Sequence, residues 1–470
     1  MLIRNLQARH LNMIALGSCL GTGIFLASGY AIHVAGPGGA LLAYSLISLM
    51  VFFLITSLGE LATYRPTSGS FCEYSSLYVH KSFGFGMSYN YWFNWAVTIP
   101  TEIGAAALVM QYWYPDVSIF TFGMIFFGLI FVSNFFSIRL FGEAEYWMSF
   151  IKIGAIIVFI VLALFLVIKD PQAGIRNFVV EDAPFHNGWA GFIAVFLAAG
   201  FAFQGSELIG VSAGESRDPQ KSIPRAVKNV FWRLLVFYIL TTLLVGLLIP
   251  FNDPHMTVRD VSTSPFTLVF NNYLSADIVA TIMNIVVLTA IVSAANASFY
   301  AATRTLWYMG TIRQAPHFFS KTTKQGAPLY ALFCTGVVAF LVLLLAMSDN
   351  QDFFNNLFTV SSLCGYIAWF GIALSHYCFR KRYLKDDLSD LTYKSTFFPW
   401  APIISMLFIA MIMLGQGFTI EEFTVSEIIV KYGALIAFVL IIIGHKLIAK
   451  PEPVNLQRGS TRLTIETSDR

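Results

Sequence analysis

The sequence has 470 residues, of which 57% are apolar and 12% are charged, whereas an average soluble protein has about 25% charged residues. This composition excludes an ordinary soluble enzyme and leaves room for about a dozen membrane crossings of about 20 apolar residues each. The 29 Lys and Arg residues nearly balance the 26 Asp and Glu residues, so a concentrated basic surface for nucleic acid is not expected. The five cysteines have neither metal-ligand nor disulfide spacing, and we expect no metal and no cofactor.

Apolar runs of helical length predict an all-α membrane protein with twelve transmembrane helices. The runs lie at 11–34, 39–62, 86–111, 118–138, 146–168, 190–212, 229–250, 277–303, 329–347, 355–378, 399–417 and 428–448. The first run is too long for a signal peptide, so we expect it to stay in the mature protein. If the N-terminus is cytoplasmic, 24 of the 29 Lys and Arg residues lie in inner loops or at inner ends of runs. Because positive residues collect on the inner side, both termini are expected in the cytoplasm.

Glycines interrupt the first and the sixth run. The first contains Gly21, Thr22 and Gly23 in succession, and the sixth contains three glycines within 200–210. These are equivalent positions if runs 1–5 and 6–10 are two copies of a five-helix unit, the second inverted because five is odd. Such a pattern is typical of inverted-repeat transporters, and close helix packing on glycine is the alternative. The predicted parts are a first repeat at 1–170, a second at 171–395, two helices at 396–450 and a disordered cytoplasmic tail at 451–470.

A helix break inside a membrane frees backbone groups that hydrocarbon cannot satisfy, so it must line a cavity or bind a polar ligand. The N–H groups of residues 21–23, at the positive end of a helix dipole, suit a carboxylate. Carbonyl groups freed near Cys19, Phe201 and Gln204 can accept hydrogen bonds from an ammonium. Together the two breaks indicate a site for a zwitterion such as the head group of an α-amino acid.

Charged side chains within the runs are few, and each is a functional candidate because burial is costly unless the charge is paired or hydrated. Glu102 lies in the third run, and we expect it to pair with a cationic substrate side chain. Lys152 in the fifth run either neutralises a neighbouring carboxylate or replaces a bound sodium ion and releases its proton. Glu207, within the break of the sixth run, can equally carry the proton. The residues alone leave open which of these two couples transport to protons.

Aromatic residues crowd the third and sixth runs, among them Tyr91, Trp95 and Phe201. Most are expected to pack between helices or to anchor the membrane interface, and Phe201 is the candidate for a gate over the substrate. The segment 214–225 mixes both charge signs and contains two prolines. It is either a basic loop that sets the topology or an inner gate closed by salt bridges, with Glu215 as its acidic group.

These motifs, together with "AGPGGALLAY" at 35–44, "YNYWFNWAVT" at 89–98 and "FGEAEYW" at 141–147, resemble the bacterial amino acid permeases of the amino acid-polyamine-organocation superfamily. The stretches "FQGSELIG" and "GESRDPQKSIPRAV" are most similar to its lysine-specific permease branch. The resemblance implies the leucine-transporter fold, with five plus five inverted helices, two more helices, and helices 1 and 6 broken. It also implies a proton-coupled symporter in the inner membrane that imports a cationic amino acid, in this branch lysine.

The same resemblance implies which residues of this sequence form the site. Its substrate site falls on Cys19, Thr22, Gly23, Phe201 and Gln204, and its proton-linked groups fall on Lys152 and Glu207. Three further positions match residues implicated in lysine transport, and these are Tyr91, Trp95 and Glu215.

Two other functions stay open at this point. One is a permease or exchanger for neutral amino acids or for many of them, and the other is a membrane receptor that binds an amino acid and signals. An enzyme is not expected, because the sequence contains no His-Glu-x-x-His metal-ligand motif. The expected partners are an amino acid, a proton and the lipid bilayer, with no nucleic acid, and the oligomeric state is left open.

Overall fold

The structure, a computed structural model, describes residues 13, 17, 19–135, 138–169, 171–256, 264–274, 277–323, 326–347, 351–384, 388–419, 424–449, 456–458 and 463–465. These residues form helices and connecting turns, apart from two short antiparallel strands near the C-terminus, β1 (Leu456–Arg458) and β2 (Leu463–Ile465). The predicted all-α fold class is therefore confirmed. Most of the tail that we expected to be disordered lies outside the described residues.

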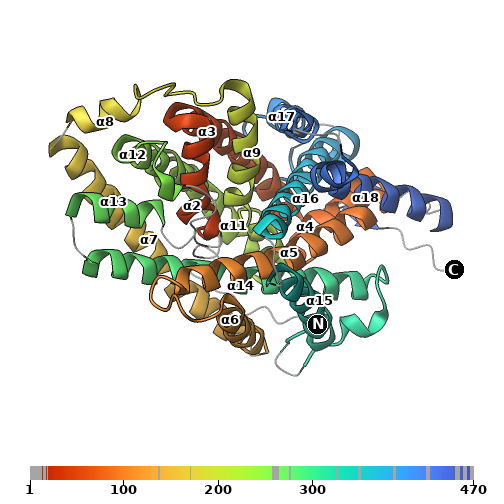
Figure 1. Cartoon of the computed structure of the whole chain (residues 1–470). Coiled ribbons are helices and arrows are strands. Elements are labelled where there is room, and N and C mark those ends of the chain that lie inside the picture. Colours follow the sequence, from red (N-terminus) through yellow and green to blue (C-terminus); the bar gives the residue numbers. More distant parts are fainter. Residues whose placement is uncertain are drawn as a thin grey trace.

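The helices pack into one bundle (Figure 1). The first half contains α2 (Thr22–Phe25), α3 (Ala27–Tyr64), α4 (Ser70–Tyr74), the π-helical turn η1 (Ser75–Val79), α5 (Lys81–Met110), α6 (Ile119–Ser133), α7 (Ile138–Lys169) and α8 (Pro171–Asn177). The second half contains α9 (Gly188–Phe203), α10 (Leu208–Ser212), α11 (Pro219–Arg233), the π-helical turn η3 (Leu234–Leu240), α12 (Thr241–Leu248), α13 (Pro265–Leu274), α14 (Asp277–Thr311), α15 (Leu329–Met347), α16 (Gln351–Cys378), the π-helical turn η6 (Phe379–Leu384), α17 (Trp400–Gly415) and α18 (Val425–Ala449). Short 3-10 turns complete the described chain at η2 (Ala213–Glu215), η4 (Pro254–Met256), η5 (His317–Ser320) and η7 (Gln416–Thr419).

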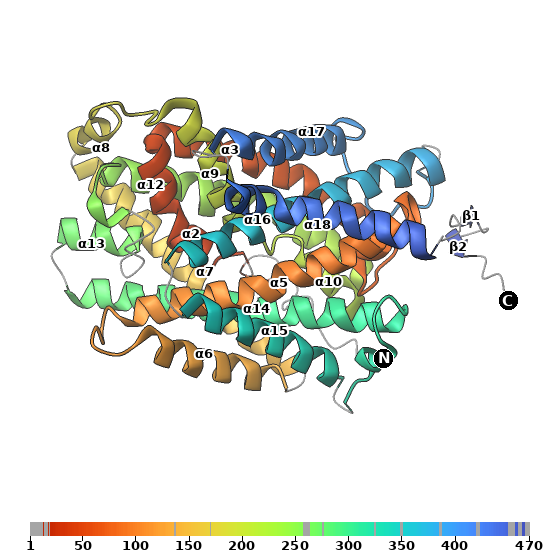
Figure 2. The same ribbon diagram turned by 45° about the vertical axis from the view of Figure 1, so that its right-hand side comes forward.

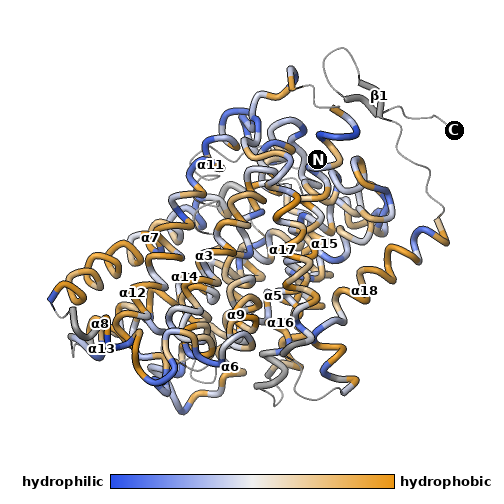
Figure 3. The backbone as a smooth tube through the Cα atoms, turned by 90° about the horizontal axis from the view of Figure 1, so that it is seen from above, coloured by the Kyte–Doolittle hydropathy of each residue, from blue (hydrophilic) through white to orange (hydrophobic). Residues whose placement is uncertain are grey.

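Nine helical segments of the described chain are long and apolar enough to cross a membrane, so this is a multi-pass membrane protein. Two shorter apolar helices, α6 and α17, accompany them. Large apolar side chains are exposed along α7 and α18, as expected for helices that face lipid. Figure 3 shows both helices as hydrophobic over most of their length, whereas hydrophilic residues gather at helix ends and on α11.

Several helix boundaries differ from the predicted runs, and two of these differences change how the chain is divided into helices. The seventh run was expected to begin at 229, but the helix begins with α11 at Pro219. The first half of α11 is amphipathic, and its apolar side buries Ile223 and Val227, so a search for continuous apolar residues misses it. The first two runs share the helix α3, which is kinked at Gly36 (φ 73°). A positive φ of this kind favours glycine, because it has no Cβ.

α5 packs most extensively on α14, and the two helices lie side by side in both views (Figure 1, Figure 2). α14 contributes small residues such as Ala294 and Ser298, which allow close approach of helices in a membrane. α3 packs on α9, and α2 also contacts α9, so the first glycine-containing stretch (19–25) and the second (200–210) are neighbours.

The two glycine-containing stretches lie between helix ends. α9 ends at Phe203 and α10 begins at Leu208, and Gly205 between them has a positive φ of 91°. Gly21 directly precedes α2, which is four residues long. The non-helical residue Leu26 then separates α2 from α3. A Cβ on Gly23 would come within 2.1 Å of the Cα of Ala202, so glycine is required for the two stretches to touch.

Candidate functional site

A buried cavity lies between the two glycine-containing stretches, α5 and α14. Its volume of about 20 Å³ is far below the about 300–1,000 Å³ that is usual for a small-molecule site. The cavity has room for about one water molecule, so a larger ligand requires the lining side chains to move apart. The lining residues are Cys19, Gly21, Gly23, Trp95, Thr98, Glu102, Phe201, Gln204, Ala294 and Ser298.

Seven of the nine residues predicted to bind substrate line this cavity, and the other two, Thr22 and Tyr91, contact charged groups beside it. Sequence reasoning missed the wall formed by α14. Its residues Ala294 and Ser298 are one helical turn apart and line the cavity. Small uncharged residues carry no signal in the sequence that distinguishes a cavity wall from ordinary helix packing.

Glu102 connects α5 to the first glycine-containing stretch. The hydroxyl of Thr22 donates a hydrogen bond to Oε2 of Glu102, and both side chains are buried. Trp95, Thr98 and Glu102 share one face of α5 because they are spaced by one and two helical turns. A carboxylate therefore lies at the edge of the cavity, where a cation would be its natural counter-ion.

Gln204 is held in place by a network of polar side chains. Asn94 Nδ2 donates to Gln204 Oε1 at 3.1 Å, and Gln204 Nε2 donates to the carbonyl of Ser361 on α16 at 2.9 Å. The Ser361 hydroxyl lies 2.7 Å from that of Thr98. These bonds hold the end of α9 against α5 and α16. The ring of Phe201, one turn earlier, lies against Phe358 of α16 with 4.2 Å between the ring centroids.

Glu207 lies in the stretch between α9 and α10 and accepts three hydrogen bonds. The donors are the hydroxyl of Tyr91 (3.3 Å), the indole N–H of Trp369 (3.0 Å) and the backbone N–H of Gly205 (3.3 Å). The side chain is fully buried, and within the described chain it forms no ion pair. The contact joins two residues that the sequence predicted separately, Tyr91 and Glu207. Trp369 was missed, because its partner lies 162 positions away along the chain.

Lys152 projects from α7 toward the first glycine-containing stretch. Its Nζ donates to the carbonyl of Gly17 at 2.9 Å and lies 3.7 Å from Oε1 of Glu145. The hydroxyl of Ser293 on α14 donates to the same carboxylate oxygen at 2.7 Å. Glu145 was not predicted as a site residue. Its signal was present, since it precedes Lys152 by seven residues and so shares a helix face with it.

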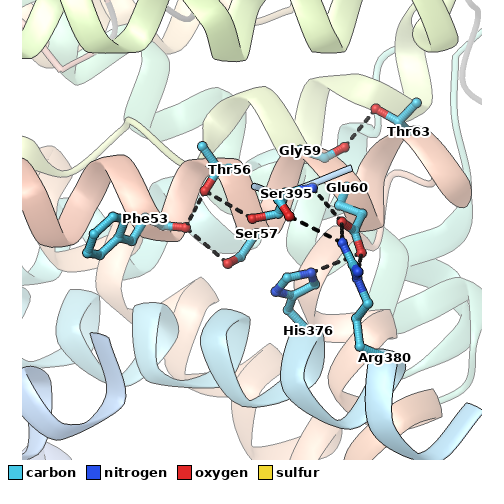
Figure 4. A network of polar contacts seen from close by, with 9 residues as sticks. All are labelled: Phe53, Thr56, Ser57, Gly59, Glu60, Thr63, His376, Arg380 and Ser395. Carbon is cyan, nitrogen blue, oxygen red and sulfur yellow. Dashed lines mark hydrogen bonds and ion pairs between the residues drawn. The ribbon is translucent and has the colours of Figure 1, made fainter. Parts of the chain in front are cut away.

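Two further buried ion pairs lie away from the cavity. Glu215, the acidic group of the predicted inner gate, accepts a hydrogen bond of 3.0 Å from Nε of Arg304 on α14. Figure 4 shows the second, which involves Glu60 on α3. The carboxylate of Glu60 accepts two hydrogen bonds from the guanidinium group of Arg380 (2.6 and 2.5 Å) and one from the backbone N–H of Ser395 (2.6 Å). His376 Nε2 lies 3.0 Å from the same carboxylate. These contacts hold α3, α16 and the segment before α17 together.

Comparison with known proteins gives matches over almost the whole chain. A family model described as amino acid permease matches residues 10–456. The chain is 48% identical over 459 residues to the lysine-specific permease LysP of Escherichia coli (strain K12), which covers 95% of this chain and 93% of that protein. It is 43% identical to LysP of Lactococcus lactis subsp. cremoris (strain MG1363), with 97% and 92% covered. It is 42% identical to the histidine permease HisP of the same strain, with 94% of each covered.

Proposed function

The chain belongs to the amino acid permease family, and on this basis we propose that it is a proton-coupled symporter that imports a cationic amino acid, lysine. The family match confirms the resemblance that the sequence motifs indicated. The two LysP relatives support lysine, and their names describe transporters and not enzymes. The histidine permease at 42% identity keeps a wider range of amino acids as the second candidate.

The observation that carries the proposal is the hydrogen bond between Thr22 and Glu102 at the edge of the buried cavity. Here Glu102 holds the place that a substrate carboxylate would take at the first glycine-containing stretch. When the substrate enters, its carboxylate replaces Glu102 at Thr22, and Glu102 turns to the cationic side chain of the substrate. Two opposite charges of one ligand are then matched by one protein carboxylate and one polar backbone stretch.

The α-ammonium group of the substrate binds backbone carbonyls at Cys19, Phe201 and Gln204, which line the same cavity. Phe201 forms the gate, because its ring lines the cavity and packs on Phe358, so the ring must turn before a larger ligand fits. The ion pair of Glu215 with Arg304 is the inner gate.

Proton coupling rests on Lys152 and Glu207. Lys152 contacts the chain just before the first glycine-containing stretch through Gly17, where a bound sodium ion would otherwise hold the break. A cation already present there makes a second cation unfavourable, so a proton and not sodium drives uptake. Glu207 lies in the second stretch without a counter-ion in the described chain, which favours a carboxyl group that gains and loses a proton.

For the membrane arrangement we propose twelve spans in the inner membrane with both termini in the cytoplasm. The nine long segments and the two shorter apolar helices supply eleven, and the kink of α3 at Gly36 divides the first span from the second. The parts are two inverted repeats (1–170 and 171–395), the pair of helices at 396–450 and the tail. The excess of Lys and Arg in the inner loops supports this orientation.

The test is uptake of labelled lysine into proteoliposomes under an imposed proton gradient, with sodium present or replaced by choline. We expect uptake to rise as the external pH falls, to stop when a protonophore is added and to ignore sodium. Competition by each of the twenty amino acids then defines the substrate range. Sodium-dependent uptake that ignores the proton gradient would reject the coupling, and stronger competition by a neutral amino acid than by lysine would reject the substrate.

A further inference from the structure

One side chain contacts both glycine-containing stretches. The hydroxyl oxygen of Tyr238 lies 3.0 Å from the carbonyl oxygen of Cys19 and 2.9 Å from that of Ala202. Cys19 precedes α2, and Ala202 belongs to the last turn of α9. A tyrosine hydroxyl has a single hydrogen to donate, so this hydrogen is shared between the two carbonyls or alternates between them.

The carbonyl of Ala202 needs such a donor. The last carbonyls of a helix have no partner within the helix, and inside a membrane water does not replace one. At the end of α9, Phe201 accepts the backbone N–H of Gln204, and Phe203 accepts the hydroxyl of Ser206. Tyr238 satisfies the carbonyl of Ala202 that lies between them.

The position of Tyr238 is built into the helix that carries it. Tyr238 belongs to the π-helical turn η3, which interrupts the helix between α11 and α12. Such turns are rare and frequently occur at functional sites. The ring is fully buried and stacks on Phe203, with 4.0 Å between centroids and 22° between planes. Packing therefore fixes the orientation of the ring and directs the hydroxyl toward the two carbonyls.

We propose that Tyr238 is a positioning residue that fixes the two glycine-containing stretches relative to each other, so that the two halves of an amino acid head-group site form together. This inference rests on the proposed function, because it takes the stretches as the sites for carboxylate and ammonium. Tyr238 does not line the cavity and acts through the backbone at Cys19 and Ala202. Without the hydroxyl the stretches lose this polar link and are held less firmly, so a ligand that binds both must order them first.

The consequence is specific to ligands that use both halves of the site. Lysine has both a carboxylate and an α-ammonium group, whereas lysinamide lacks the carboxylate charge and relies on the ammonium half. Loss of the hydroxyl should weaken the binding of lysine much more than the binding of lysinamide. A side chain with only a structural role would affect both ligands equally.

The variant for the test is Tyr238→Phe, which keeps the ring and its stacking on Phe203. Tyr44→Phe is the matched control. Tyr44 is also fully buried and packs on Phe203, with 5.8 Å between centroids, but within the described chain its hydroxyl has no hydrogen-bond partner. Full-length protein in proteoliposomes is assayed for KM and Vmax with labelled lysine and for inhibition by lysinamide, and thermal unfolding is followed in detergent.

We expect the KM for lysine to rise about tenfold in Tyr238→Phe, with Vmax within about twofold of the wild type and Tyr44→Phe unchanged. The inhibition constant of lysinamide should change less than about twofold. The ratio of the two constants does not depend on the amount of folded protein, so partial misfolding leaves the test intact.

Three results would overturn the inference while the wild type transports lysine. These are an unchanged KM, equal weakening of lysine and lysinamide, and tighter binding of lysine, which would make the hydroxyl a competitor of the substrate ammonium. If the wild type transports no amino acid at all, the proposed function itself is rejected, and this inference with it.

Discussion

The ammonium group of Lys152 and the carboxylate of Glu145 face each other at 3.7 Å, and neither side chain is exposed to solvent. They share a face of α7, and Ser293 from α14 and the carbonyl of Gly17 complete the contact. Removing both charges of a buried ion pair costs less stability than removing one, because a single remaining charge is uncompensated.

We therefore expect Glu145→Gln to lower the free energy of unfolding by about 3–5 kcal/mol. The double variant with Lys152→Met should regain most of this stability, because no buried charge then remains. Thermal unfolding in detergent measures both effects, and Glu143→Gln, a partly buried position on the same helix, is the control. A double variant no more stable than Glu145→Gln would show that the two residues do not act as a pair.

The same double variant separates stability from coupling. If Lys152 carries the coupling, the stable double variant should exchange lysine across the membrane but fail to accumulate it under a proton gradient. Accumulation equal to that of the wild type would assign Lys152 to structure alone.

Glu102→Gln should raise the KM for lysine by at least about 30-fold, because a cationic side chain then enters the membrane without a counter-ion. Inhibition by a neutral amino acid should change much less. Thr22→Val keeps the size of the side chain but removes the donor to Glu102, so it separates the hydrogen bond from the charge. Equal weakening of cationic and neutral ligands by Glu102→Gln would make Glu102 a structural or coupling residue.

Glu207→Gln should abolish accumulation against a gradient while lysine exchange between the two sides stays within about tenfold of the wild type. The amide cannot exchange a proton. Its NH₂ group cannot accept a hydrogen bond, so the variant loses either the bond from Trp369 or those from Tyr91 and Gly205. Proteoliposomes with an imposed gradient, compared with counterflow, distinguish the two activities. Tyr91→Phe removes one donor and keeps the acid, so it should retain accumulation. A Glu207→Gln protein that still accumulates lysine would remove Glu207 from the coupling.

Arg380→Met should lower the free energy of unfolding by about 3–5 kcal/mol, because Glu60 then remains buried without its guanidinium partner (Figure 4). Arg382→Met, an exposed position in the same helical turn, should stay within about 0.5 kcal/mol of the wild type. Thermal unfolding compares the two. If both variants unfold at the same temperature, the Glu60 network contributes nothing to stability.

The sequence predicted most of the helices well, since the length of an apolar run is a local property. The run at 329–347 coincides with α15, and the run at 399–417 exceeds α17 by three residues in total. The additional helix α13 was not predicted, because ten residues are too short for a membrane crossing. The count of twelve spans and the inverted repeat stay predictions.

The sequence by itself also determined which residue types are candidates. A charge or a glycine pair inside an apolar run is unusual whatever surrounds it, and this singled out Glu102, Lys152 and Glu207. It did not determine their partners. Tyr238 contacts carbonyls 219 and 36 positions away, and Arg380 contacts a carboxylate 320 positions away. Such pairs depend on how the helices pack, and each helix offers several polar residues that could meet. Only the tertiary structure decides which of them do, because burial makes an unpaired polar group costly and selects the packing in which the groups are paired.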